Sequence, residues 1–414
     1  MRIDTLDILR CPYCGGRLEL AASSFHVRTD TEIDDGILQC ACRVFPVVAG
    51  IPVMQLDHPT IAARDHVVAG RPDLALRAMF DFEPEHAVCF EAIAASDTAT
   101  YRDVLNALGP NYERGYFLYR FSDPSYLVAH ALTRAIAATV LRDGGRAIDI
   151  CGGSGHLTRP LIDLSTPAPV LADLYFGKLW LARRFTTPGC EAVCCNGNAP
   201  FPFARGAFRY AMCADAFMFI WPKRQFVGEM LRLIDDGGGL GAAVVSHTHN
   251  QLKWSPSLGQ PLPPDGYRNL FETLEPRIFS EEGLFEDVVK GGPLDLARHD
   301  PAEVVDRDPA LVVVATAHPG VFRPHALEYQ SGAPGELRVN PLYEAQVQGD
   351  QVQLRRRFPS ADYEEEFGAC REYLPETVLV DRASLAALGT GRLPPELADL
   401  AQRRVILDLP RKYY

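Results

Sequence analysis

The sequence predicts an α/β fold built on a doubly wound, mostly parallel sheet, with a small module before it and a small α+β domain after it. Between about residues 146 and 246, short β-branched runs alternate with helical patterns. Such alternation is typical of a parallel sheet that helices cover on both faces. Four cysteines lie within the first 42 residues, and the alternation stops after about residue 320. These two observations separate a module at each end from the central sheet.

The composition is that of a globular protein in water, with 414 residues, 47% of them hydrophobic and 23% charged. A chain of this length predicts two to four domains. The formal net charge of −12 argues against a large phosphate-binding surface, so nucleic acid is not the expected partner. No apolar run approaches the roughly 18 residues that span a bilayer, and the first residues lack the pattern of a signal peptide. We therefore expect a cytoplasmic protein without a membrane partner.

Five strands are expected in the central region, and helical patterns separate them. They cover residues 146–150, 169–173, 190–195, 209–214 and 240–246. A helix with an amphipathic pattern is expected over residues 121–145, before the first strand. Asp123 would be its N-cap and Pro124 would occupy its first turn. Shorter helices, broken by Gly, Pro and Ser, are expected over residues 59–110.

Two cysteine pairs in the N-terminal module have the spacing of a zinc site. The pair in CPYC lies on a turn, and a hairpin-length interval separates it from the pair in CAC. Four thiolates can surround one zinc ion tetrahedrally, each about 2.3 Å from the metal, and such a closed site is structural. The predicted ligands are Cys11, Cys14, Cys40 and Cys42. The remaining cysteines are interpreted as small buried hydrophobic residues.

The residues around these cysteines resemble a known zinc-ribbon family. LDILRCPYCGGRLEL and GILQCACRVFPVVAGIPVM are similar to the small zinc-ribbon proteins that serve eukaryotic methyltransferases as a separate activating subunit. Bacterial relatives share the ending FPVVAGIPV, here residues 45–53. The resemblance covers residues 1 to about 56 and implies a structural zinc.

The first expected strand leads from Asp149 into the loop CGGSG, and the question is which nucleotide this loop holds. A dinucleotide loop has the pattern G-x-G-x-x-G, and its last glycine lets the helix pack closely on the sheet. Here Thr158 stands at that last place. An S-adenosylmethionine site has no pyrophosphate to hold, and its loop passes beneath the amino-acid part of the ligand. Asp149, Gly153 and Gly155 are in register with that second pattern.

An acid ends the second expected strand. Asp173 lies 18 residues beyond Gly155, where a carboxylate can accept hydrogen bonds from both ribose hydroxyls. The alternative interpretation is that Asp173 is an ordinary helix N-cap. Together with the glycine loop, the acid favours the nucleoside site.

From about residue 112 to 318 the chain resembles class I S-adenosylmethionine-dependent methyltransferases. The match rests on the glycine loop, on Asp173, on the pair Pro202-Phe203, and on the glycine turn at residues 237–238. The resemblance implies a seven-stranded sheet that binds S-adenosylmethionine as cofactor.

Three positions depart from the family pattern. Cys151 stands where the family has its first glycine, which requires a backbone without positive φ. Asn196 and Asn198 stand where an Asp meets the adenine amino group, and an amide oxygen can still accept that bond. Arg209 replaces the acid that enters the fourth strand.

The fifth expected strand ends in the candidate catalytic residues His247 and His249. By strand alternation both point the same way, at the edge of the sheet where ligands bind. Histidine suits the base that a hydroxyl acceptor needs, because its pKa lies near neutrality; the alternative is that both rings bind loop backbone. Arg120 is placed to approach the carboxylate of the cofactor, with a surface position as the alternative. His156 is expected to pack over the cofactor.

The last ninety residues predict a small α+β domain. Strands are expected over residues 336–340, 343–358 and 404–410, and helices over residues 361–374, 382–389 and 394–402. Helices with a hairpin also fit a winged helix, but the basic run at residues 355–357 is its only support. We expect a substrate lid or a dimerisation module, which would make the chain a homodimer.

The expected domains are a zinc ribbon at residues 1–58, a helical linker or cap at 59–110, a methyltransferase domain at 111–320 and the C-terminal domain at 321–414. The resemblances together imply methyl transfer from S-adenosylmethionine to a small molecule with a hydroxyl, amine or carboxyl group. Two alternatives stay open. One is an RNA methyltransferase, since some bacterial enzymes that methylate ribosomal RNA also begin with a zinc ribbon, and the other is a non-catalytic scaffold with a decayed site.

Overall fold

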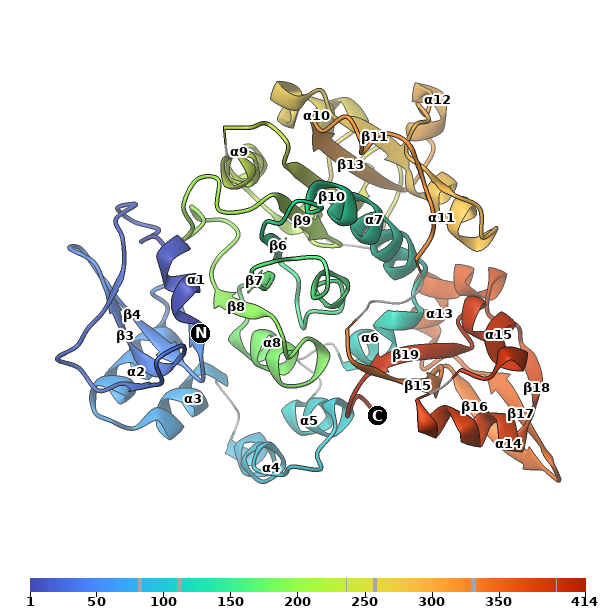
Figure 1. Cartoon of the computed structure of the whole chain (residues 1–414), viewed down its shortest axis with the longest axis horizontal. Coiled ribbons are helices and arrows are strands. Elements are labelled where there is room, and N and C mark those ends of the chain that lie inside the picture. Colours follow the sequence, from blue (N-terminus) through green and yellow to red (C-terminus); the bar gives the residue numbers. More distant parts are fainter. Residues whose placement is uncertain (81–83, 110–113, 236, 256–258, 329–332, 392) are drawn as a thin grey trace.

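The computed structural model describes residues 1–80, 84–109, 114–235, 237–255, 259–328, 333–391 and 393–414. A central sheet lies between an N-terminal module, blue in Figure 1, and a C-terminal domain, red in the same view. Across this described part of the chain, no helix combines the length and the apolar character needed to cross a membrane.

The central sheet has seven strands in the order β11-β13-β10-β9-β6-β7-β8. Five of them match the five expected runs, and they pair in parallel, whereas β13 is antiparallel to both of its neighbours. The prediction of a mostly parallel, seven-stranded sheet is thus confirmed. The strands are β6 (Ala147–Ile150), β7 (Val170–Asp173), β8 (Glu191–Cys194), β9 (Tyr210–Ala214), β10 (Ala242–His249), β11 (Arg277–Ser280) and β13 (Ala310–Thr316).

Helices cover both faces of this sheet, which explains why its strands are almost continuously apolar. Along β7, Leu171 belongs to the core on one face, and Val170 and Ala172 belong to the core on the other. The first core holds residues of α7 (Pro124–Val140), α8 (Phe176–Leu181) and α11 (Glu281–Val289). The second holds residues of α9 (Lys223–Ile234), α10 (Pro264–Leu270) and α12 (Ala302–Val305).

Helix α7 has Asp123 at its N-cap and Pro124 in its first turn, as expected, but it corrects the expectation of an amphipathic helix. Fifteen of its 17 residues are buried, so it is not amphipathic in its surroundings. The reason is that α7 lies between the sheet and the C-terminal domain, and α11 packs beside it on the same face of the sheet. Asp123 stands at the N-cap but makes no capping hydrogen bond. Its carboxylate instead accepts from the hydroxyl of Tyr363 and lies 3.4 Å from Nη1 of Arg120.

The N-terminal module extends the edge of the central sheet. Val53, which follows β5, bridges Cys194 of β8 in parallel, and the N–H of Met54 donates to the carbonyl of Cys194 at 2.7 Å. A ribbon strand therefore continues the hydrogen bonding of β8. The elements of the module are α1 (Ile3–Ile8), β1 (Glu19–Leu20), β2 (Val27–Arg28), β3 (Ile33–Gln39), β4 (Val44–Val48) and β5 (Ile51–Pro52).

Five short helices connect the ribbon to α7. Tyr101, in the fourth of them, is fully buried, and its hydroxyl lies 2.7 Å from Oγ of Ser154 in the glycine loop. The connection thus supports the loop from below the sheet edge. The helices are α2 (His58–Val68), α3 (Pro72–Phe80), α4 (Pro84–Ala94), α5 (Tyr101–Leu108) and α6 (Arg114–Tyr119).

The C-terminal domain contains two small antiparallel sheets, and it packs against the segment before α7. Asn340 is fully buried there: its Oδ1 accepts from the hydroxyl of Ser122 at 2.9 Å, and its Nδ2 donates to the carbonyl of Arg404. One sheet pairs β15 (Gly335–Val339) with β19 (Ile406–Pro410), and the other joins β16 (Tyr343–Gln348), β17 (Gln351–Arg356) and β18 (Thr377–Asp381). The helices are α13 (Ala361–Phe367), α14 (Arg382–Ala387) and α15 (Ala398–Gln402). A further strand pair joins β12 (Leu294–Asp295) to β14 (Pro324–His325).

Candidate functional site

A cavity of about 490 Å³ lies at the carboxyl ends of β6, β7, β8 and β9. This is the edge at which open α/β sheets bind ligands. Its size falls within the range of small-molecule sites. The described residues that line it include Tyr116, Phe117, Arg120, Asp149, Cys151, Gly152, Gly153, His156, Asp173, Tyr175, Lys178, Asn196, Asn198, Asp215 and Phe219.

The two predicted loop glycines have different places. Gly153, at φ +57°, lines the cavity, whereas Gly155, at φ +78°, lies beneath it. A Cβ on Gly155 would come within 2.9 Å of Oγ1 of Thr187. Gly155 therefore permits close packing of the loop on its neighbours, and only Gly153 faces the ligand space.

Cys151 has the positive φ that the sequence analysis required it to avoid. Its φ is +61°, in the left-handed region where a Cβ is strained. The N–H of Cys151 still donates to the carbonyl of Ala172 at 2.7 Å, so the pairing with β7 continues up to this residue. The chain then turns sharply into the glycine loop. A non-glycine residue costs roughly 1–2 kcal/mol in this conformation. The loop thus keeps the backbone of a glycine although the residue is cysteine.

One carboxylate oxygen of Asp149 has no hydrogen-bond partner among the described residues. Asp149 is fully buried, and its Oδ2 accepts from the hydroxyl of Thr158 at 2.6 Å. Its Oδ1 is buried and has no hydrogen-bond partner among the described residues. Burial raises the pKa of Asp149 to about 7. A cationic group in the cavity would satisfy this oxygen and favour its ionised form.

Asp173 holds the glycine loop and lines the cavity. Its Oδ2 accepts from the N–H of Gly153 and its Oδ1 from the N–H of Tyr175, both at 2.9 Å. The residue at the N-cap of α8 is Tyr175, so Asp173 is not the N-cap of that helix. Because Asp173 lines the cavity, its carboxylate is placed to accept from ligand hydroxyls as well.

The two asparagines order the loop after β8. Oδ1 of Asn196 accepts from the N–H of Asn198 at 2.8 Å, and Oδ1 of Asn198 accepts from the N–H of Trp221 at 2.9 Å. Both line the cavity. Each amide oxygen can still accept one further hydrogen bond.

Arg120 is buried, so the surface alternative for it is wrong. Its guanidinium lies 3.4 Å from Oδ2 of Asp215 and also 3.4 Å from Oδ2 of Asp123. Asp215 accepts from the hydroxyl of Tyr116 at 2.5 Å, and all three of Arg120, Asp215 and Tyr116 line the cavity. The sequence reasoning missed Asp215, although it directly follows an expected strand at the edge of the sheet used to select the other candidates.

Neither His247 nor His249 is among the described residues that line the cavity. His247 lies between two acids: its Nδ1 is 2.7 Å from Oε1 of Glu281, and its Nε2 is 3.8 Å from Oδ1 of Asp215. Although burial opposes it, these acids raise the pKa of His247 to about 9. Burial and the charge of His247 lower the pKa of His249 to about 4, and the ring of His249 bonds Oγ of Ser255 at 2.9 Å.

His156 packs against Phe117, with ring centroids 5.9 Å apart in a stacked arrangement. Burial lowers the pKa of His156 to about 3, so the ring is neutral at pH 7. Its Nε2 lies 2.8 Å from the hydroxyl of Tyr413, near the end of the chain. The C-terminal residues thus support one wall of the cavity.

The four predicted zinc ligands come together in the ribbon. Their sulfurs all lie within 4.8 Å of one another. Sγ of Cys42 is 3.6 Å from Sγ of Cys11 and 3.6 Å from Sγ of Cys40, and Sγ of Cys14 is 3.8 Å from Sγ of Cys40. Tetrahedral zinc with bonds of about 2.3 Å places its sulfurs about 3.8 Å apart. The cluster is therefore consistent with zinc.

Solved structures of S-adenosylmethionine-dependent methyltransferases are similar to this chain. A complex of the Haloferax volcanii methyltransferase activator Trm112 with a protein described as a methyltransferase gives 18% identity, a TM-score of 0.35, and coverage of 45% of this chain and 89% of that one. A Thermotoga maritima methyltransferase is 14% identical, with a TM-score of 0.34, and the match covers 52% of this chain and 97% of that one. Phosphoethanolamine N-methyltransferase 2 of Haemonchus contortus, solved with S-adenosylhomocysteine bound, is 13% identical, with a TM-score of 0.32. The match covers 44% of this chain and 52% of that one.

No protein-family model matches the sequence, and no curated protein matches it either. The central sheet of this chain has seven strands and is mixed, because β13 is antiparallel to both of its neighbours.

Proposed function

We propose that the chain transfers a methyl group from S-adenosylmethionine to a small molecule with a hydroxyl, amine or carboxyl group. The observation that carries the proposal is the cavity at the sheet edge. There the acid that ends β7, the glycine loop and the unpaired oxygen of Asp149 face one space of about 490 Å³.

The described residues supply a partner for each end of the cofactor. The Oδ1 of Asp149, unpaired among the described residues, fits the ammonium of the methionine part, and the carboxylate of Asp173, which lines the cavity, fits the ribose hydroxyls. The amide oxygens of Asn196 and Asn198 fit the adenine amino group. When bound, S-adenosylmethionine supplies the activated methyl group.

The acceptor end of the cavity is assigned to Asp215. Methyl transfer needs an aligned nucleophile about 3 Å from the methyl carbon, and a carboxylate can hold an acceptor hydroxyl or amine by its hydrogen. Tyr116 and Arg120 fix the carboxylate of Asp215 from one side, and His247 fixes it from the other.

The geometry changes the roles proposed for the two histidines. Because the pKa of His247 is about 9, its ring is protonated at neutral pH and cannot accept a proton; we assign it as a positioning residue for Asp215. His249 is neutral at pH 7, but a pKa of about 4 makes it a weak base, and it does not line the cavity among the described residues; we therefore no longer assign it the role of base.

The ribbon is assigned a structural role. Zinc in the four-cysteine cluster would hold the fold of the ribbon, and the ribbon covers the edge of β8 through the contacts of Val53 and Met54 with Cys194. A covered sheet edge is protected from pairing with other chains.

Calorimetric titration with S-adenosylmethionine and with S-adenosylhomocysteine tests the cofactor. We expect both to bind with one site per chain, and binding of neither would contradict the proposal. Transfer of a labelled methyl group into a small-molecule extract then identifies the acceptor. Label that appears in RNA instead would assign the activity to the alternative class.

A further inference from the structure

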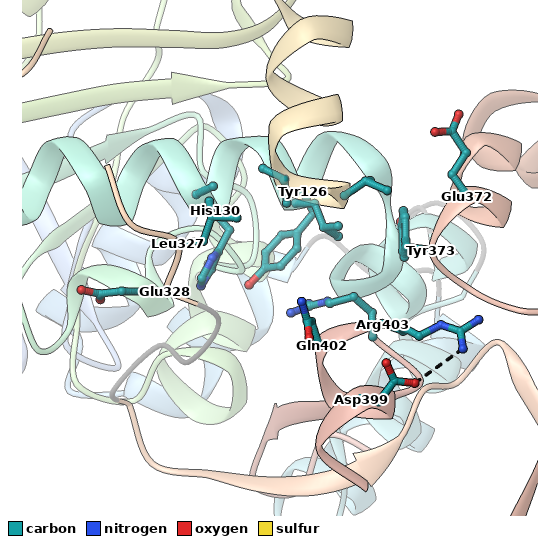
Figure 2. A pocket seen from close by; sticks show the side chains of 14 residues that line it. Tyr126, His130, Leu327, Glu328, Glu372, Tyr373, Asp399, Gln402 and Arg403 are labelled. Atoms are coloured by element: carbon teal, nitrogen blue, oxygen red, sulfur yellow. Dashed lines mark ion pairs between the residues drawn. The ribbon is translucent and has the colours of Figure 1, made fainter. Parts of the chain in front are cut away.

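A second cavity lies between α7, α11 and the C-terminal domain, and Figure 2 shows it from close by. Its volume is about 250 Å³, which is room for roughly eight water-sized groups. Among the described residues, it shares no lining residue with the cofactor cavity. What it binds can therefore be inferred independently of methyl transfer.

Two buried polar side chains of α7 face this cavity without partners. Tyr126 and His130 are 3% and 6% exposed, and their ring centroids lie 5.7 Å apart, one helical turn from each other. In the described part of the chain, neither the hydroxyl of Tyr126 nor the ring nitrogens of His130 make a hydrogen bond, although both residues line the cavity (Figure 2). Their polar atoms are open to the cavity and unpaired within the described residues, so a ligand in the cavity can form hydrogen bonds with them.

The charged side chains around the cavity leave one cation, Arg404, and one exposed acid, Glu372, without an ion pair in the described part of the chain. The carboxylate of Glu372 points away from Tyr126 and His130 (Figure 2). Arg403 pairs with Asp399 at 3.6 Å, as the dashed line in Figure 2 marks. Glu328 is paired with Arg134. Arg404 donates to the carbonyl of Phe121 at 2.9 Å, but no carboxylate of the described residues pairs with it.

Arg404 lines the cavity, and its guanidinium lies near the ring of Tyr126. Its guanidinium lies 5.8 Å from the ring centre of Tyr126, and its Nε is buried without a partner among the described residues. Burial and the positive charge of Arg404, Arg134 and Arg159 lower the pKa of His130 to about 3. A neutral His130 ring has one donor and one acceptor nitrogen. The polar end of the cavity thus offers one cation and two neutral donors.

The remaining wall is apolar. It is formed by α7, α11 and the segment before residue 329, with the side chains of Leu127, Ala131, Val288, Val289 and Leu327. An inorganic phosphate would bring a second charge and no apolar body to this wall. A short organic acid matches both halves of the cavity.

We propose that this cavity binds a small monocarboxylate, with its carboxylate on Arg404 and the hydroxyl of Tyr126 and its short apolar body against the wall of α7 and α11. The donor nitrogen of His130 completes the hydrogen bonds of the carboxylate. A carboxylate that accepts from a guanidinium and a phenol makes charge-assisted bonds, which are stronger than neutral ones.

Calorimetry on the full-length protein compares butyrate and benzoate with butyramide and benzamide, which have the same shape without the charge. We expect saturable binding of at least one acid, at least about tenfold tighter than that of its amide, and no binding of inorganic phosphate. Equal binding of acid and amide would show a merely apolar cavity and overturn the proposal. Phosphate binding at this site, or no binding of either acid, would overturn it too.

Variants of Arg404 and Tyr126 test where in the cavity the ligand binds. Arg404→Met should weaken binding of the acid by about tenfold or more, whereas Arg268→Met, an exposed arginine that is paired with Asp265 and does not line the cavity, should leave it unchanged. Tyr126→Phe keeps the ring and should weaken binding several-fold. Equal effects of the two arginine variants would contradict the site.

Should Arg404→Met fail to fold, crystals of the unchanged protein soaked in 4-bromobutyrate give the same information. We expect the anomalous signal of bromine between α7 and α11. A signal elsewhere, or no signal, would overturn the proposal.

Discussion

The carboxylate of Asp173 accepts a hydrogen bond from the backbone N–H of Gly153 at 2.9 Å. This bond ties the end of β7 to the glycine loop after β6, and both residues line the cavity at the sheet edge. The same residue therefore shapes the loop and offers acceptor sites to a ligand. Its removal should change both stability and cofactor binding.

Asp173→Ala should lower the affinity for S-adenosylhomocysteine by about two orders of magnitude, because each charge-assisted bond to a ribose hydroxyl contributes roughly 1.5–3 kcal/mol. It should also lower the free energy of unfolding without cofactor by about 1–3 kcal/mol, since the N–H groups of Gly153 and Tyr175 lose their acceptor. Calorimetry and urea unfolding measure the two quantities.

Asp381 provides the matched control. It is an exposed acid that caps α14 by accepting from the N–H of Ser384 at 2.9 Å. Asp381→Ala should cost about 1 kcal/mol of stability and leave cofactor affinity unchanged. An Asp173→Ala protein that binds the cofactor as well as the unchanged one would remove Asp173 from the site.

Asp149 should make cofactor affinity depend on pH. Burial raises its pKa to about 7 in the free protein, so its carboxyl is protonated below that value and ionised above it. Only the ionised form attracts an ammonium, and affinity should therefore rise between pH 6 and pH 8, by up to about tenfold. Calorimetry at pH 6, 7 and 8 measures this rise. Asp149→Asn should abolish the dependence, and a variant that retains it would assign the titration to another group.

The five parallel strands could be predicted because each is buried on both faces and so reads as a continuous apolar run. Strand β18 (Thr377–Asp381) was not predicted, since it is short and only one of its residues, Val380, is buried. Its place depends on pairing with β17, and a five-residue window does not contain that information.

Within the site, the predicted residues were those whose place follows from the end of a strand. Asp149, Asp173, Asn196 and Asn198 line the cavity for that reason. The sequence could not predict that His247 lies between two acids, because Glu281 is 34 positions away and belongs to α11. Its protonation state depends on this packing.

Zinc content tests the cysteine cluster. The purified protein should contain about one zinc per chain, and the double variant Cys11→Ser with Cys40→Ser should contain none, because four thiolates complete the tetrahedral site. Mass spectrometry of the metal measures both. Cys89→Ser, an exposed cysteine outside the cluster, is the control and should keep its zinc. Full zinc in the double variant would show that other ligands hold it.

Removal of that zinc should loosen the ribbon first, because metal binding supplies folding energy to so small a module. Hydrogen exchange after treatment with a chelator should increase in residues 1–54, including the N–H of Met54, which donates to the carbonyl of Cys194. Equal exchange across the whole chain would contradict a local role.

His247 should make stability fall at alkaline pH. Its pKa is about 9 in the folded protein and about 6.5 when unfolded, so the protonated ring stabilises the fold fully below pH 6.5. This contribution, about 2–3 kcal/mol at most, is lost as pH rises through 9. Urea unfolding at pH 6, 7.5 and 9 should show the loss, and His247→Gln should remove it. The exposed His58→Gln variant serves as control; an unchanged pH dependence in His247→Gln would contradict the ion pairs with Glu281 and Asp215.

Tyr413 should be essential to the wall of the cofactor cavity. It is fully buried, its ring stacks on Tyr101 at 4.7 Å, and its hydroxyl donates to the carbonyl of Phe117 at 2.7 Å. Because that hydroxyl proton is already used, the bond of 2.8 Å to Nε2 of His156 requires the imidazole to donate. Tyr413→Phe keeps the ring but leaves the carbonyl and the imidazole N–H buried and unpaired. The free energy of unfolding should fall by about 2–4 kcal/mol.

The neighbouring tyrosine gives the comparison for this variant. Tyr414 is only partly buried, and its hydroxyl donates to the carbonyl of Leu118 at 3.1 Å. Tyr414→Phe should therefore cost no more than about 1 kcal/mol. Since Phe117 and His156 both line the cavity, Tyr413→Phe should also weaken cofactor binding several-fold, whereas Tyr414→Phe should not. Urea unfolding and calorimetry on the two variants give both quantities, and equal losses in the two would show that Tyr413 supports the chain end alone.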